Sequence, residues 1–258
     1  MKQNAKLVCV NPTCKKQFEI RSLQIRCDKC DFLLDVEYKD TPPSKLKETF
    51  YERRDPQGSL YNESGVWRFR ELLNFCEIDT DDFDQCSKFL VSLDGAEGRQ
   101  SKPYHMSKVS NFINIDNENL MLQPEGYNPS GSFKDNGMSS AVTHAKMMGA
   151  KKIICASTGN TSASAGMFAA NENMECDVYI PDGQIAPGKL SQAYQFGTQM
   201  IKVSGNFDDA FTKSLEAAKQ AGSYTVNSVN PFRIEGQKTI PFRALEFLNW
   251  DVPDWIVY

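Results

Sequence analysis

Short apolar runs alternate with helical patterns along the second half of the chain. From residue 150 onward, the segments KKIICA, CDVYI, QMIKV and SYTV each precede a stretch with apolar residues at helical spacing. Such an alternation predicts a parallel sheet with helices on both of its faces, and therefore an α/β fold. The final residues, PDWIVY (253–258), have the pattern of one more strand that enters the interior.

Two residues in this half indicate helix boundaries. Asn206 stands before Asp208 and Asp209, and this arrangement predicts an N-cap followed by an acidic first turn. Pro241 lies inside a later helical pattern. A proline in a helix interior removes a hydrogen bond at a cost of about 3 kcal/mol, so we expect Pro241 to kink or divide that helix.

A single lysine follows a turn that is rich in glycine and proline. The segment PEGYNPSGSFKDNGM (124–138) places two prolines and two glycines within eight residues, which predicts a turn of fixed shape. Ser132 is the expected N-cap of the helix that follows, so Lys134 falls in its first turn. The positive end of the helix dipole disfavours an ammonium there, and a free amine can capture a carbonyl group. An ordinary solvated lysine is the alternative.

A second polar loop follows the predicted strand IICA. Residues 157–161, STGNT, stand between this strand and a predicted helix. Backbone N–H groups at a helix N-terminus bind anions, and ligands of open α/β sheets bind beyond the carboxyl ends of the strands. The loop is therefore a candidate anion site. An ordinary Ser/Thr/Asn helix cap is the alternative interpretation.

Four cysteines near the N-terminus form two closely spaced pairs. Four residues separate Cys9 from Cys14, twelve separate Cys14 from Cys27, and two separate Cys27 from Cys30. This spacing is typical of a zinc ribbon, in which four thiolates close the coordination shell and leave the metal a structural role. Two disulfides are the alternative. Nearby basic residues also allow a nucleic-acid-binding or protein-binding ribbon; these are Lys15, Lys16, Arg21, Arg26 and Lys29.

The segment between the ribbon and the lysine turn is harder to interpret. Residues 38–65 are polar and suit a surface linker. Residues 64–75 place Trp67, Leu72 and Phe75 among charged residues, as in a short amphipathic helix. The acidic run 79–84 is expected to be a solvated loop, because it lacks the alternation and the glycine of a calcium loop.

Composition narrows the class of protein. The 258 residues carry a net charge of −4 and a pI near 5.4, which gives no overall footprint for nucleic acid. The longest apolar runs are too short to span a membrane, and the N-terminus lacks the apolar core of a signal peptide, so we expect a cytoplasmic protein. His105 and His144 are the two histidines. They are too few for a histidine-driven mechanism, and His144 is expected to be a packing residue.

Four segments together resemble the threonine synthase family of pyridoxal-phosphate enzymes. They are PEGYNPSGSFKDNGM, ASTGNTSASAG (156–166), GKLSQA (188–193) and NPFRIEGQKT (230–239), in the order of the family. The resemblance implies a fold type II scaffold preceded by a small zinc ribbon. It divides the chain into a ribbon (1–38), a linker and N-terminal extension (39–100) and a catalytic domain (101–258). It also implies that a C-terminal part is missing, and that this chain alone has little activity.

The same resemblance implies roles for individual residues. Lys134 holds pyridoxal phosphate as a Schiff base, Phe133 lies beside the cofactor, and Asn160 contacts its phenolic oxygen. The loop after the strand binds the substrate carboxylate, and two cations bind the substrate phosphate. The implied substrate-binding residues are Ser157, Thr158, Gly159, Thr161, Lys189 and Arg233. The implied reaction converts the phosphorylated amino acid O-phosphohomoserine and water to threonine and phosphate, in a monomer or homodimer.

One segment departs from the family pattern. Residues 94–104 read DGAEGRQSKPY, where threonine synthases have a GEGxTPL-like sequence with a Thr-Pro pair. Because of this departure, a second enzymatic function remains an alternative. It is a cysteate-synthase-like β-replacement on O-phosphoserine. A third hypothesis is a non-catalytic, zinc-ribbon binding protein on an enzyme scaffold.

Overall fold

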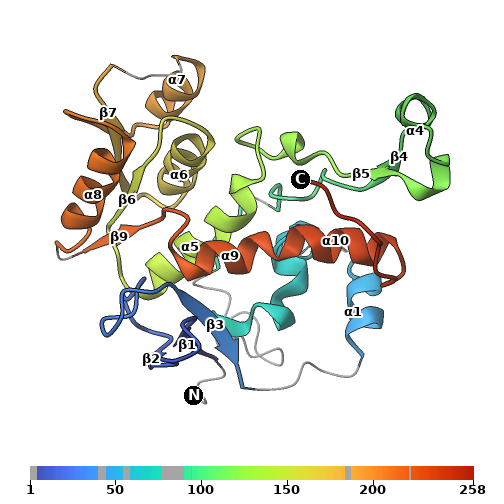
Figure 1. Cartoon of the computed structure of the whole chain (residues 1–258), viewed down its shortest axis with the longest axis horizontal. Helices are drawn as coiled ribbons and strands as arrows, with labels where there is room; N and C mark the ends of the chain where they lie inside the picture. Colours follow the sequence, from blue (N-terminus) through green and yellow to red (C-terminus); the bar gives the residue numbers. More distant parts are fainter. Residues whose placement is uncertain are drawn as a thin grey trace.

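The chain contains a small antiparallel sheet, a larger parallel sheet and a projecting arm (Figure 1). The computed structural model describes residues 5–39, 45–54, 59–76, 90–93, 95–183, 187–220 and 222–258. The acidic run 79–84 lies outside these residues. None of the helices in the described part is long and apolar enough to cross a membrane.

The antiparallel sheet is built from the N-terminal residues. Its strands are β1 (Ala5–Cys9), β2 (Gln17–Glu19) and β3 (Leu34–Tyr38), in the order β2-β1-β3. Both cysteine pairs are followed by a residue with a left-handed backbone, Lys15 after Cys14 and Asp31 after Cys30. These turns return the chain so that the two cysteine pairs face each other.

The parallel sheet confirms the α/β prediction. Strands β6 (Lys152–Ala156), β7 (Glu175–Pro181), β8 (Gln199–Val203) and β9 (Ser223–Thr225) are all parallel, in the order β8-β7-β6-β9. Helices α6 (Asn160–Asn171), α7 (Pro187–Gln195) and α8 (Phe207–Ala217) connect the strands. Helix α8 lies on one face of the sheet and α6 on the other (Figure 1). Asn206 caps α8, as predicted, and Asp209 completes a capping box.

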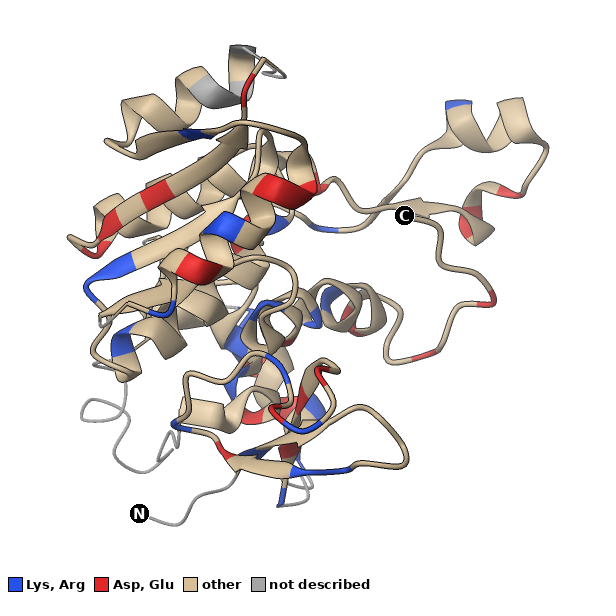
Figure 2. Cartoon of the chain, turned by 60° about the vertical axis from the view of Figure 1, so that its left-hand side comes forward, with Lys and Arg blue, Asp and Glu red and all other residues tan. Residues whose placement is uncertain are grey.

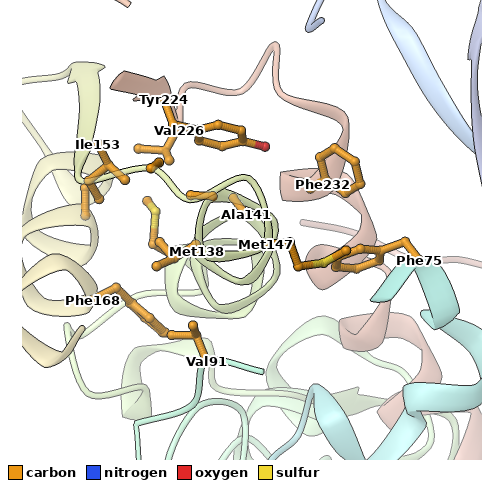
Figure 3. Close-up of a cluster of buried hydrophobic side chains, with 14 of the residues drawn as sticks. Phe75, Val91, Met138, Ala141, Met147, Ile153, Phe168, Tyr224, Val226 and Phe232 are labelled. Atoms are coloured by element: carbon orange, nitrogen blue, oxygen red, sulfur yellow. The ribbon is translucent and has the colours of Figure 1, made fainter. Parts of the chain in front are cut away.

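Helix α5 (Lys134–Met147) is the centre of the structure and is buried along almost its whole length. Figure 3 shows apolar side chains around it from the sheet, from α6 and from the N-terminal extension. It packs closely on α9 (Pro231–Gln237), because glycines face each other at the crossing. A Cβ at Gly137 would lie 2.7 Å from the Arg233 carbonyl oxygen, and a Cβ at Gly236 would overlap the Asn136 carbonyl.

The helical pattern around Pro241 is divided, as predicted. Helix α9 ends at Gln237, and α10 (Thr239–Phe247) begins two residues later with Pro241 in its first turn. A proline is tolerated there because the first N–H groups of a helix have no partner within the helix.

The described residues 45–54 and 59–76 of the N-terminal extension form helices. They contain α1 (Leu46–Glu52), α2 (Leu60–Glu63) and two 3₁₀ helices, η1 (Trp67–Leu72) and η2 (Asn74–Cys76). Phe50 of α1 is fully buried against Phe69 and Trp250. The short helix predicted within 64–75 is present, but its geometry is 3₁₀ and it divides into η1 and η2.

The arm consists of β4 (Tyr104–His105), α4 (Ser107–Ile113), η4 (Asn117–Asn119) and β5 (Met121–Leu122), and η5 (Glu125–Tyr127) leads from it to α5. The predicted strand at 253–258 is wrong. These residues lie in no strand, and Trp255 and Val257 are largely exposed. A strand needs a hydrogen-bonded neighbour, and none of the described strands pairs with this segment.

Candidate functional site

Lys134 is the first residue of α5, so its predicted place in the first turn is confirmed. The helix starts one residue later than predicted, because its N-cap is Phe133 and not Ser132. The Ser132 hydroxyl still accepts a long hydrogen bond of 3.4 Å from the Lys134 N–H. The Lys134 side chain is half-buried, with its Nζ 4.0 Å from the centre of the Phe133 ring. Phe133 thus forms the floor under the amine.

The surroundings of Lys134 favour its neutral form. Burial lowers the pKa of the Lys134 amine, and the positive charge of Arg233 lowers it further. Both causes act against the ammonium ion. A lysine with a lowered pKa is a better nucleophile toward a carbonyl group, which is the chemistry predicted for this residue.

Arg233 extends from α9 into the interior below this site. Its side chain is 1% exposed, and its Nη1 donates a hydrogen bond of 2.7 Å to the Val226 carbonyl oxygen. Its Nε and Nη2 have no hydrogen-bond partner in the described part of the chain. Burial lowers the pKa of the guanidinium to about 10. Two unpartnered donors on one buried cation suit an anionic ligand.

The turn before Lys134 is held by a buried carboxylate that the sequence analysis did not identify. Asp135 accepts hydrogen bonds from the Ser130 N–H at 2.7 Å, from the Ser130 hydroxyl at 2.5 Å and from the Ser164 hydroxyl at 2.6 Å. Ser164 lies on α6, and Gln192 of α7 donates to the Ser130 carbonyl oxygen. The start of α5 is therefore fixed to two other helices. The only signal in the sequence is a serine-rich turn that ends in Lys-Asp.

The segment that departs from the family pattern packs against the same turn. The Gly98 N–H donates a hydrogen bond of 2.7 Å to the Asn128 side chain. The Glu97 carboxylate is fully buried and accepts from the Ser64 and Ser92 hydroxyls, at 2.6 and 2.7 Å. Burial raises the pKa of Glu97. Gly98 thus ties this segment to the lysine turn, and the buried, hydrogen-bonded Glu97 precedes that contact.

The polar loop 157–161 lies at the carboxyl end of β6, as predicted. Its five residues are half-buried, and α6 begins at Asn160. Asn227 fixes the end of the strand through two hydrogen bonds, of 3.0 and 2.9 Å, to the backbone of Ala156. The bond between Ser164 and Asp135 brings α6 beside the start of α5. Lys189 lies in α7, but its side chain falls outside the described part of the structure.

The four cysteines of the ribbon lie together. Their Sγ atoms are all within 4.8 Å of one another, with 3.4 Å between Cys9 and Cys30 and 3.7 Å between Cys14 and Cys27. These distances are too long for the ~2.05 Å bond of a disulfide. They are close to the ~3.8 Å between thiolates around a tetrahedral zinc with ~2.3 Å bonds.

The basic residues of the ribbon are partly neutralised. Lys16 pairs with Asp28 at 2.7 Å, and Arg26 pairs with Asp31 at 3.4 Å. Figure 2 shows both signs of charge interspersed over this part of the chain. Two of the five basic residues noted in the sequence of the ribbon are thus paired with carboxylates.

Comparison with known proteins places the chain in a family. Residues 103–258 match the model of the pyridoxal-phosphate dependent enzymes, and the chain belongs to this family. Within it, the chain is 37% identical to threonine synthase of Methanocaldococcus jannaschii over 245 residues, which cover 95% of this chain and 55% of that one. It is 53% identical to threonine synthase of Bacillus sp. (strain ULM1) over 130 residues, covering 50% and 37%. The chain spans about half the length of the curated relatives it matches most completely.

Solved structures support the fold. Diaminopropionate ammonia lyase of Escherichia coli aligns with a TM-score of 0.52 at 16% identity, over 58% of this chain and 47% of that one. Maize serine racemase aligns with a TM-score of 0.51 at 18% identity, over 58% and 45%. These likenesses confirm the predicted scaffold and say nothing about the substrate.

Proposed function

We propose that this chain carries the lysine-bearing part of a threonine-synthase-like enzyme, which converts O-phosphohomoserine and water to threonine and phosphate. The observation that carries the proposal is the half-buried amine of Lys134 at the start of α5. The similarity to threonine synthases over most of the chain supports the substrate class, a small phosphorylated amino acid.

The residues around Lys134 fit pyridoxal phosphate. A covalent link to the aldehyde needs an amine that is neutral near pH 7, and burial beside Arg233 favours that form. Lys134 would hold the cofactor, Phe133 would lie beside it, and Asn160 would hydrogen-bond its phenolic oxygen. When bound, the cofactor supplies the electron sink for carbanion chemistry.

The protein supplies binding groups and proton transfer. Lys134 Nζ, once free, acts as a general base and acid that moves a proton at the substrate carbon next to it. The loop 157–161 binds the substrate carboxylate through N–H groups at the start of α6. The unpartnered Nε and Nη2 of Arg233 suit the substrate phosphate, and Lys189 is proposed to assist.

The runner-up substrate is O-phosphoserine, in a β-replacement reaction. The departing segment 94–104, which lacks the Thr-Pro pair, keeps this alternative, because the segment contacts the turn that positions Lys134. The test uses a protein that contains the catalytic elements of the longer relatives. Incubating it with each substrate in turn and identifying the products distinguishes the two reactions.

We further propose that residues 1–38 form a structural zinc unit and that residues 101–258 belong to the catalytic domain. Residues 39–100 connect the two. Prolonged treatment with a strong chelator is expected to release one zinc ion per chain. Hydrogen exchange of the β1 and β3 amides should then rise to near the unfolded rate, because such ribbons fold with their metal. A chelated ribbon that keeps its protection would contradict the assignment.

The function proposal is tested by the absorbance of the chain with pyridoxal phosphate. We expect a lysine-dependent band that is strong in a protein with the catalytic elements of the longer relatives and weak in this chain alone. Borohydride reduction should trap it as a covalent adduct on Lys134. Lys134→Ala should abolish both signals, whereas Lys151→Ala, which removes an exposed lysine, should leave them unchanged. An adduct spread over surface lysines, equal in the two variants, would reject Lys134 as the cofactor lysine.

A further inference from the structure

We propose that the cysteine ribbon is a metal-dependent clamp on the two helices that carry Lys134 and Arg233, with Tyr38 and His144 as its positioning residues. The clamp is defined as two contacts: Tyr38 with Glu235, and His144 with the Ile20 carbonyl. The proposal deepens the function above, since it assumes that Lys134 is the cofactor lysine.

The first contact fixes α9. The Tyr38 hydroxyl, at the end of β3, donates a hydrogen bond of 2.5 Å to Oε2 of Glu235. Glu235 is fully buried and its other oxygen pairs with Lys238. Glu235 stands two residues from Arg233 in the same short helix. A shift of Glu235 would therefore move the guanidinium that faces Lys134.

The second contact fixes α5. His144 is fully buried, and its Nε2 lies 2.8 Å from the Ile20 carbonyl oxygen in the ribbon. A carbonyl can only accept, so Nε2 carries the hydrogen, and Nδ1 accepts from the Tyr224 hydroxyl at 2.7 Å. The ring stacks on Phe232 of α9, with 3.6 Å between ring centres. One imidazole thus joins the ribbon, α5, α9 and β9.

The two helices respond together. Close backbone approach at Gly137 and Gly236 packs α5 tightly on α9, so a displacement of one displaces the other. The contacts with the ribbon lie three helical turns from Lys134 on α5, and half a turn from Arg233 on α9. A ribbon of this size depends on its metal for folding. The metal at Cys9, Cys14, Cys27 and Cys30 therefore influences the Lys134 site without contacting it.

The test uses the whole chain and two readouts. Hydrogen exchange of the α5 and α9 amides needs no cofactor. The induced circular dichroism of pyridoxal phosphate on Lys134 reports a fixed orientation at the site. The variants are Cys14→Ser, which breaks the metal site, and Tyr38→Phe, which removes one hydroxyl. The controls are Cys176→Ser, a buried thiol on β7, and Tyr51→Phe, an exposed tyrosine.

We expect Cys14→Ser to release the metal, to increase exchange in α5 and α9 about five- to tenfold and to weaken the dichroism. Tyr38→Phe should have a similar, smaller effect while it keeps the metal. The double variant should resemble Cys14→Ser alone, because both changes break one connection. Neither control should change the exchange of α5 and α9.

The proposal is overturned if Cys14→Ser releases the metal while α5 and α9 keep their exchange rates. It is also overturned if the effects of Cys14→Ser and Tyr38→Phe add independently. Should wild type give no dichroism, the assignment of Lys134 fails, and the exchange data still decide the clamp. His144→Phe, which keeps the stacked ring but loses both hydrogen bonds, should accelerate exchange in α5 with the metal retained.

Discussion

Asp135→Ala is expected to lower the free energy of unfolding by about 4 kcal/mol. Hydrogen bonds to a charged group contribute about 1.5 to 3 kcal/mol each, and a buried donor left without a partner adds a further cost. Asp135 is fully buried and accepts three hydrogen bonds, two of them from Ser130. Its loss leaves the Ser130 N–H without its acceptor and frees the turn before Lys134.

Urea unfolding of wild type and Asp135→Ala measures this change. Asp135→Asn should lie between the two, because one amide oxygen can still accept while the other position becomes a donor. Asp251→Ala removes an exposed carboxylate and should change the stability by less than about 0.5 kcal/mol. A loss under about 1 kcal/mol for Asp135→Ala would show that the turn is held by other contacts.

Acidification is expected to destabilise the protein through His144 by about 3 kcal/mol between pH 6.5 and 4. Burial lowers the pKa of His144 from 6.5 to about 4, and the charge of Arg21 also lowers it. The folded state therefore holds the neutral ring. Below pH 6.5 the unfolded chain binds a proton that the folded chain does not, so stability falls with pH until the folded pKa is reached.

The measurement is the difference in unfolding free energy between wild type and His144→Phe, at about pH 7 and about pH 5. The advantage of wild type should shrink as the pH falls, because the variant has no imidazole to protonate. Hydrogen exchange of the ribbon amides at both pH values checks that the ribbon stays folded, because His144 contacts it at the Ile20 carbonyl. An advantage that stays constant with pH would mean that the folded chain binds the His144 proton as readily as the unfolded chain does.

The parts of the fold that sequence could predict are those set by neighbouring residues. The strand and helix alternation after residue 150, the capping box at Asn206 and the division near Pro241 all follow from local patterns, and all are confirmed. The spacing of the four cysteines predicted a cluster, and the structure brings them together. Lys134 falls in a first turn for the same reason, since apolar residues at helical spacing begin directly after the Gly/Pro-rich turn.

The parts that sequence could not predict depend on distant partners. Asp135 was overlooked because its acceptor role depends on Ser164 in another helix. The 3₁₀ geometry near Trp67 depends on contacts with distant segments. One of them is the hydrogen bond that the Trp67 indole N–H donates to the Val91 carbonyl oxygen. Nothing near residue 233 indicates that Arg233 turns inward to Val226.

The connection between Tyr38 and Glu235 also constrains the order of events during synthesis. The ribbon leaves the ribosome first, and roughly 200 residues separate Cys30 from Glu235. Synthesis proceeds at about 5 to 20 residues per second, so roughly 10 to 40 s pass between the synthesis of the ribbon and that of the helix that covers it. With the proposed zinc bound, the ribbon would fold in that interval as an independent unit, with the Ile20 carbonyl and the Tyr38 hydroxyl open to water. The N-terminal unit is thus a template already in place when α5 and α9 emerge.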